Sequence, residues 1–180
     1  KANENLLSEQ ASQLRTLSLS VERCPVSIMI TDPHGITEYV NQRFIETTGY
    51  QRQEIVGKKP SILKSGKTPG VTYESLWQSI SAGQEWQGEF INQSKSGDHF
   101  WVETSIIPIL SESGNTLHYV SLQADITERK KLEEKLKYQA THDGLTGLPN
   151  RKGLMTQAEY AIAIAKRNKT QAALLFVDLD

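Results

Sequence analysis

The chain has 180 residues, and its 20 lysines and arginines nearly balance 21 aspartates and glutamates, giving a formal net charge of −1 at pH 7. This balance leaves no strongly basic face for nucleic acid, and the single cysteine, Cys24, excludes an internal disulfide framework. No apolar run approaches the roughly 20 residues of a membrane-spanning helix, and no signal peptide is recognisable. Because the chain begins at Lys1, we expect it to be cut from a longer protein that is cytoplasmic, or the cytoplasmic part of a membrane-anchored protein.

The first segment, residues 1–24, reads as a helix that Pro25 ends. Apolar residues recur in it at intervals of seven in two rows: Leu7, Leu14 and Val21, and Leu17 with Cys24. This short heptad pattern predicts a contact between two helices, and hence a homodimer. The alternative is a helix that only caps its own domain.

Residues 25–127 form the second segment, in which short strands alternate with turns and helices. Asp32-Pro33-His34-Gly35 favours a tight turn, and Asn41 and Gly49 suit the two ends of a short helix. A further helix carries apolar side chains at helical spacing between Tyr73 and Ile80. The expected strands are residues 27–31, 36–40, 86–93, 99–110 and 116–124. This order predicts an α+β fold with one antiparallel five-stranded sheet and flanking helices.

Several short motifs in this segment occur in the order typical of one known family. They are Ile30-Thr31-Asp32, Tyr39-Val40-Asn41, Thr48-Gly49-Tyr50, Glu54-Ile55-Val56-Gly57, Gly88-Glu89-Phe90-Ile91-Asn92 and Asp125-Ile126-Thr127-Glu128. Together they resemble a PAS sensor domain. The resemblance implies that a small ligand is held between the inner face of the sheet and the helices, and that this domain is a sensor and not an enzyme.

Within the PAS family the segment is most similar to the flavin-binding group, which includes the LOV domains and the redox sensor of nitrogen-fixation control. The resemblance implies that the Asn92 amide bonds the flavin ring edge and that Gln123 meets N5. Trp77 and Trp86 are candidates to cover a ring face or the adenine of FAD, and the alternative is that they are core residues. Departures from the LOV pattern are Pro60, which offers no nucleophile for adduct photochemistry, and Val102, which replaces a second asparagine.

Three occupants of the cavity stay open: a flavin, with FAD before FMN, no ligand in a domain that serves dimerisation, or another small molecule. If no flavin binds, Asn92 and Gln123 are polar residues on the outer face of the sheet. Haem is not favoured, because the sequence places no histidine on the helix that usually offers the axial ligand. His34, His99 and His118 fall in a turn and at strand starts.

The third segment, residues 128–140, reads as a charged signalling helix. Asp125 and Glu128 have the spacing of a capping box, and with Thr127 we expect them to transmit the signal. Leu132 and Leu136 form a narrow apolar stripe, which favours a coiled-coil contact over a globular core. A solvated linker is the alternative.

The last segment, residues 141–180, couples Thr141-His142-Asp143-Gly144-Leu145-Thr146-Gly147-Leu148-Pro149-Asn150-Arg151 to a helix and to an apolar strand, Leu174–Val177, followed by Asp178-Leu179-Asp180. This order resembles the start of the α/β GGDEF domain, which joins two GTP molecules into cyclic di-GMP. The resemblance implies that Asp178 and the carbonyl of Leu179 hold Mg²⁺ with GTP in the intact protein. The alternative is that these aspartates only end a strand. The residues that would bind guanine lie beyond Asp180.

The sequence therefore predicts the sensory module of a diguanylate cyclase that dimerises through its first and third segments. The alternative is a PAS interaction module with a degenerate GGDEF domain that regulates a downstream cyclic di-GMP phosphodiesterase. In both cases we expect these 180 residues to turn over no GTP by themselves, and we expect no contact with nucleic acid or membrane.

Overall fold

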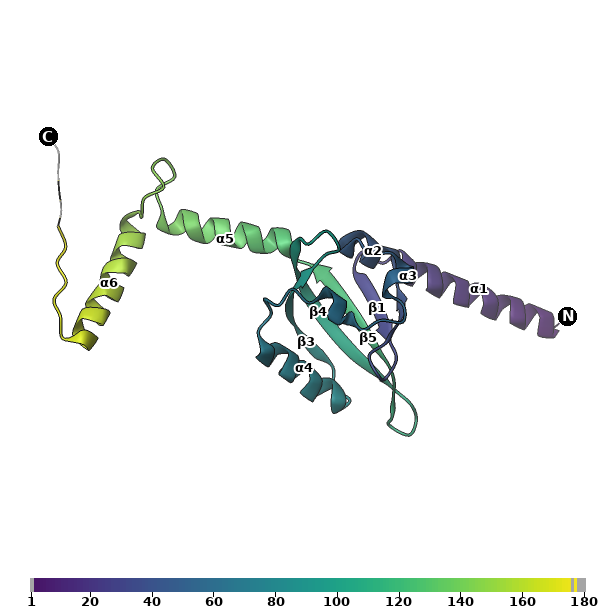
Figure 1. Cartoon of the computed structure of the whole chain (residues 1–180). Coiled ribbons are helices and arrows are strands. Elements are labelled where there is room, and N and C mark those ends of the chain that lie inside the picture. The colour runs from purple at the N-terminus through teal and green to yellow at the C-terminus, as the bar shows by residue number, and fades with distance from the viewer. Residues whose placement is uncertain (1, 176, 178–180) are drawn as a thin grey trace. The chain divides into compact units, whose positions relative to one another are not determined.

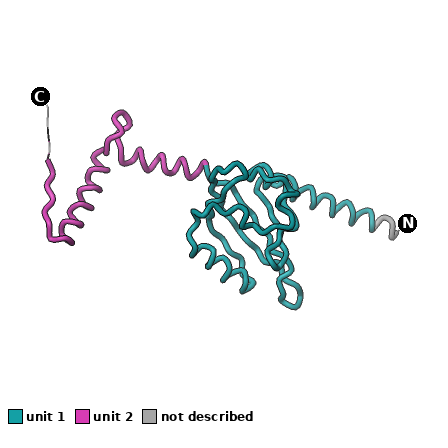
Figure 2. The backbone as a smooth tube through the Cα atoms, in the orientation of Figure 1, with its two compact units in different colours: residues 1–127 teal, residues 128–180 magenta. Residues whose placement is uncertain are grey.

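The computed structural model describes residues 2–175 and 177. The chain divides into two compact units, residues 1–127 and residues 128–180 (Figure 2). The first unit contains the sheet and the second contains two helices (Figure 1).

The sheet of the first unit has five antiparallel strands in the order β2-β1-β5-β4-β3 (Figure 1). The strands are β1 (Ser27–Thr31), β2 (Thr37–Val40), β3 (Trp86–Gln93), β4 (His99–Leu110) and β5 (Thr116–Asp125). The predicted α+β fold, with one antiparallel five-stranded sheet, is confirmed. The first hairpin closes where Asp32 Oδ1 accepts from the backbone N–H groups of His34 and Ile36, at 2.9 and 2.8 Å.

Helices cover one face of this sheet. They are α2 (Gln42–Thr48), α3 (Arg52–Ile55), the 3₁₀ helix η1 (Pro60–Leu63) and α4 (Gly70–Ser81), and α1 (Ala2–Glu22) precedes them all. One buried cluster joins Met29 and Val40 to Phe44 of α2, and another joins Leu76 and Ile80 of α4 to β3 and β4. The core is thus split into two parts, between which the cavity described below lies.

Asn41 fastens the end of α1 to the sheet. Its fully buried side chain accepts from the N–H groups of Ile28 and Phe44, at 2.9 and 3.1 Å, and so caps α2. Its amide nitrogen donates to the carbonyls of Val21 and Val26, at 3.1 and 3.0 Å. All four contacts depend on one side-chain amide, which carries donors and acceptors together.

A second contact that holds α1 to the sheet involves charged side chains. Glu22 accepts from Tyr39 Oη and from Arg52, whose Nη2 lies 2.7 Å from Glu22 Oε1. The guanidinium of Arg52 also lies over the Tyr39 ring, 5.6 Å from its centroid. The rest of α1 presents Leu7, Leu14 and Leu17 to solvent. The dimer expected along this row of leucines stays a prediction.

The signalling helix α5 (Thr127–Thr141) starts with a cap that is only half of what was expected. Asp125 Oδ1 accepts from the N–H of Thr127 at 2.9 Å. The reciprocal bond from Glu128 was predicted wrongly: in the described part of the chain its carboxylate instead accepts from Lys131 Nζ at 2.9 Å. A lysine one turn ahead attracts this carboxylate more strongly than a neutral backbone N–H does.

The second unit is built around the loop before α6 (Arg151–Asn168). Asn150 caps α6 by accepting from Gly153 N at 3.0 Å, and Asp143 Oδ1 accepts from the N–H and the hydroxyl of Thr146, at 2.9 and 2.8 Å. These hydrogen bonds hold the pKa of the Asp143 carboxyl below its usual value. A Cβ on Gly153 would lie only 2.2 Å from the Thr141 carbonyl oxygen, so this position needs glycine.

The strand expected at Leu174–Val177 does not form in the residues that are described there. Residues 170–175 have no regular secondary structure, and Leu175 is 84% exposed. A parallel strand needs neighbouring strands for its backbone hydrogen bonds, and residues 128–175 contain no other strand. Asp178 and Leu179, the expected magnesium ligands, lie outside the described residues.

Candidate functional site

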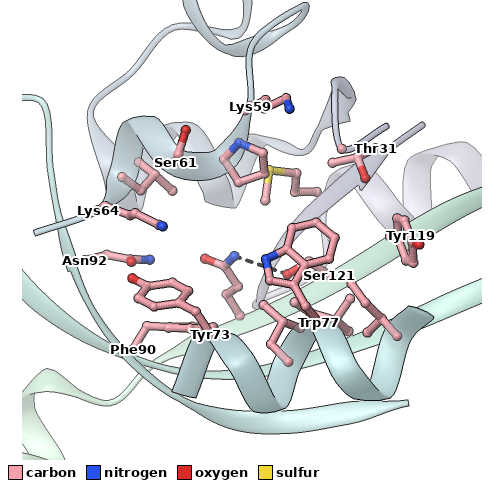
Figure 3. A pocket seen from close by; sticks show the side chains of 18 of the residues that line it. Thr31, Lys59, Ser61, Lys64, Tyr73, Trp77, Phe90, Asn92, Tyr119 and Ser121 are labelled. Carbon is pink, nitrogen blue, oxygen red and sulfur yellow. Dashed lines mark hydrogen bonds between the residues drawn. The ribbon is translucent and has the colours of Figure 1, made fainter. Parts of the chain in front are cut away.

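A cavity of about 200 Å³ lies between the inner face of the sheet, α4 and η1 (Figure 3). Its floor carries Asn92 of β3 together with Ser121 and Gln123 of β5, and α4 contributes Tyr73, Trp77 and Ile80. Lys59, Ser61 and Lys64 lie at η1, across the cavity from α4. The site therefore has polar groups on its floor, apolar and aromatic walls and two lysines beside η1.

The period of the strands explains why these polar groups meet. Alternate residues of a strand point to the same face, so Tyr119, Ser121 and Gln123 share the inner face of β5. Phe90 and Asn92 share the inner face of β3 in the same way. The alternative that placed Asn92 and Gln123 on the outer face of the sheet is therefore wrong.

The amide of Asn92 is the floor group that bears most directly on ligand binding. The residue is only 7% exposed, and no hydrogen bond to its side chain occurs within the described residues. Gln123 is 8% exposed, and its Nε2 donates to Ser121 Oγ at 3.2 Å, which leaves its oxygen for another donor (Figure 3). The Asn92 amide is open to the cavity, so a ligand that fills the cavity must pair with this amide or leave it unsatisfied at a cost of about 1–3 kcal/mol.

The two tryptophans of the sequence prediction have different positions. Trp77 lines the cavity and is 53% exposed, at the mouth. Trp86, a candidate to contact the flavin, does not line the cavity. It is 6% exposed, its ring is tilted against that of Phe90 with centroids 5.1 Å apart, and its indole N–H donates to Ser75 Oγ at 3.2 Å. Its ring lies across Gly88, where a Cβ would come within 2.4 Å of it. Trp86 is therefore a core residue.

Sequence reasoning missed Lys64 and Tyr73 as lining residues. Lys64 Nζ lies 4.1 Å from the centroid of the Tyr73 ring, and this ring stacks on Phe90 with centroids 5.4 Å apart. An ammonium group over an aromatic face is attracted by the ring quadrupole. No sequence signal separated Lys64 from the other lysines of residues 57–70, because only the fold brings it back to β3.

Neither a candidate metal cluster nor a candidate membrane-spanning helix occurs among the described residues. They contain no group of three or more histidine, cysteine, aspartate or glutamate side chains that could hold a metal ion. None of the helices found among them has the length and apolarity to cross a membrane.

Two family models match the chain. Residues 25–128 match the PAS domain, and residues 140–180 match "Diguanylate cyclase, GGDEF domain". The chain belongs to the PAS domain family and carries part of a GGDEF domain after its PAS domain.

Relatives of the PAS domain occur in several signalling proteins. The nitrogen fixation regulatory protein of Klebsiella pneumoniae is 34% identical over 121 residues, which are 67% of this chain and 24% of that protein. The aerotaxis receptor of Escherichia coli is 27% identical over 71% of this chain and 25% of the receptor. This chain thus spans about a quarter of the length of such relatives.

Solved structures agree with this assignment. The LOV domain of a blue-light activated histidine kinase from Erythrobacter litoralis has a TM-score of 0.55 and 28% identity, covering 58% of this chain and 99% of that domain. An RNA-binding light-oxygen-voltage receptor has a TM-score of 0.65 over 73% of this chain and 37% of the receptor, and its 24% identity supports the fold alone.

Proposed function

We propose that the PAS domain binds a flavin, FAD in preference to FMN, and that the state of this ligand controls a diguanylate cyclase domain in the intact protein. The single observation that carries the flavin proposal is the position of the Asn92 side chain, which is open to the floor of the cavity beside Gln123 and makes no hydrogen bond of its own within the described residues. A side-chain amide offers a donor and an acceptor together, which suits the pyrimidine edge of isoalloxazine.

The size of the cavity limits how a flavin nucleotide enters it. A volume of about 200 Å³ is below the roughly 300–1,000 Å³ of common ligand pockets, so it suits a flat ring system and not a whole dinucleotide. The ribityl and phosphate groups would lie at the mouth, where Trp77, Lys59 and Ser61 are exposed. When bound, the flavin supplies a redox or light-sensitive group, and the protein residues bind and orient it.

Few residues and few hydrogen bonds separate the floor of the cavity from the output helix α5. Gln123 lies two residues before Asp125, which ends β5 and accepts from the N–H of Thr127 at the start of α5. A ligand state that rearranges Gln123 therefore acts next to the cap of α5. Such coupling requires that the two ligand states bind the two protein arrangements with different affinity.

The output is the synthesis of cyclic di-GMP from two GTP molecules, as the partial GGDEF domain suggests. In the whole protein, Asp178 and the Leu179 carbonyl would hold Mg²⁺ with GTP. Two facing GTP sites require a homodimer. The exposed leucines of α1, and Leu132 and Leu136 of α5, offer apolar surfaces for helix–helix contacts between two copies.

The first test is the absorption spectrum of the purified chain incubated with FAD and freed of excess FAD, recorded before and after reduction with dithionite. We expect a banded flavin spectrum that bleaches on reduction. Asn92→Leu should weaken FAD binding at least tenfold, whereas Asn115→Leu, in an exposed turn, should not change it. A protein that stays colourless after incubation would exclude the flavin proposal.

A further inference from the structure

Lys64 occupies a fixed place beside the floor amide. Its backbone forms an isolated antiparallel bridge with Asn92, and its N–H donates to the Ser61 carbonyl at 3.1 Å. Its ammonium group lies over the Tyr73 ring. In Figure 3 the Lys64 side chain extends from η1 toward Tyr73 and Asn92. Backbone pairing and the aromatic ring together direct this positive charge to the polar end of the cavity.

The charge at this end of the cavity is not neutralised by its neighbours. Lys59, Lys64 and His34 line the cavity, and of its described lining residues none is an aspartate or a glutamate. In the part of the chain that the structure describes, no carboxylate forms an ion pair with Lys64. Lys64 is exposed, so water screens part of its charge, and its effect on a ligand is greatest at the short range that the cavity lining allows. The site therefore favours a ligand with negative charge near Asn92.

We propose that Lys64 sets the redox preference of the site by stabilising the reduced, anionic form of the bound flavin. This inference rests on the proposed flavin function and goes beyond it. Uptake of two electrons and one proton converts the neutral oxidised ring into a reduced ring with one negative charge. A positive charge near the pyrimidine edge stabilises the anionic reduced form of the ring relative to the neutral oxidised form. The amide of Asn92 binds both forms, and Lys64 discriminates between them.

The test is a redox titration of the whole chain loaded with FAD, with dithionite as the electron donor. Lys64→Gln keeps most of the side-chain length and removes the charge. We expect Lys64→Gln to weaken the binding of reduced FAD relative to oxidised FAD about tenfold. This change lowers the two-electron midpoint potential by about 30 mV. The affinity for oxidised FAD should stay within about twofold of the unsubstituted chain.

Two matched variants separate charge from structure. Lys64→Arg keeps the positive charge and should keep the potential near its original value. Lys67→Gln removes an exposed lysine that follows Lys64 by three residues and does not line the cavity, and it should leave the potential unchanged. This pattern would support the role of Lys64.

Four other outcomes would overturn the inference, and they separate it from the proposed function. Equal potentials for Lys64→Gln and the unsubstituted chain, or equal shifts for Lys64→Gln and Lys67→Gln, would refute the role of Lys64 and leave flavin binding in place. A shift in Lys64→Arg as large as in Lys64→Gln would show that packing and not charge matters. Failure of the unsubstituted chain to retain FAD would refute both the flavin function and the role of Lys64.

Discussion

The hydroxyl of Thr127 accepts a hydrogen bond from the backbone N–H of Trp101 at 2.9 Å, so the first residue of α5 is fastened to β4. The N–H of Ile126 adds a bond to the Trp101 carbonyl at 2.9 Å. The start of the output helix thus depends on two strands that also line the cavity, β4 through Ile106 and β5 through Ser121 and Gln123. This arrangement gives the Asp-Ile-Thr-Glu motif a physical role.

Thr127→Val should therefore loosen the start of α5. Valine has a similar shape but no acceptor, so the hydrogen bond from the Trp101 N–H to residue 127 is lost, at a cost of about 1–2 kcal/mol in the free energy of unfolding. Urea unfolding measures this cost, and hydrogen exchange of α5 shows where it acts. Glu128→Gln, which removes only an exposed ion pair with Lys131, is the control and should change stability by less than about 0.5 kcal/mol. Equal losses in the two variants would contradict the anchoring role.

Gly88→Ala tests the core position of Trp86. The added Cβ would lie 2.4 Å from two atoms of the Trp86 ring, so the ring must move and the protein should lose about 1–3 kcal/mol of stability. Tryptophan fluorescence should change with it. Gly70→Ala is the matched control, because a Cβ at Gly70 meets no atom within 4 Å, and it should be neutral or slightly stabilising. A neutral Gly88→Ala would mean that the Trp86 ring does not occupy this place.

The contact of Tyr39 with Glu22 predicts a loss of stability at alkaline pH. Burial, and then the hydrogen bond to Glu22, raise the pKa of Tyr39 to about 12, from an unfolded value near 10. Because the folded pKa is the higher one, the contribution of Tyr39 is complete below pH about 10 and is lost as the pH rises through about 12.

Tyr39→Phe checks this window by urea unfolding at several pH values. The stability difference between the unsubstituted chain and Tyr39→Phe should be largest near pH 8 and shrink as the pH rises above about 10. Tyr160→Phe, at a position that is 70% exposed, should show a small difference at every pH. A difference for Tyr39→Phe that is constant from pH 8 to 12 would contradict the raised pKa.

The role of Gln123 can be tested in the intact protein by following cyclic di-GMP synthesis with oxidised and with reduced flavin. We expect Gln123→Leu to bring the ratio of the two rates to about one. A leucine side chain forms no hydrogen bonds and therefore cannot respond to the oxidation state of the ligand. Gln87→Leu, at an exposed position of β3, should keep the original ratio. An unchanged ratio in Gln123→Leu would exclude the proposed path through β5.

Local sequence determined the elements and several of their ends. Asn41 and Gly49 limit α2 as expected, since an N-cap side chain and a left-handed glycine, φ 74°, act within a few residues of the chain. Asn92 and Gln123 were singled out by the resemblance to the flavin-binding group and not by strand period. Their placement on one wall of a cavity agrees with the family resemblance, whereas their contact with a flavin stays a proposal.

Contacts between distant segments were decided by the tertiary structure alone. Trp77 and Trp86 look equally suited to a ring contact in the sequence, yet Gly88 and Ser75 hold Trp86 in the core. Lys64 is one lysine among several until its bridge to Asn92 places it in the lining of the cavity beside that amide. Capping and strand alternation act over a few residues and are visible in sequence, whereas the environment of a side chain depends on which distant strand or helix packs against it.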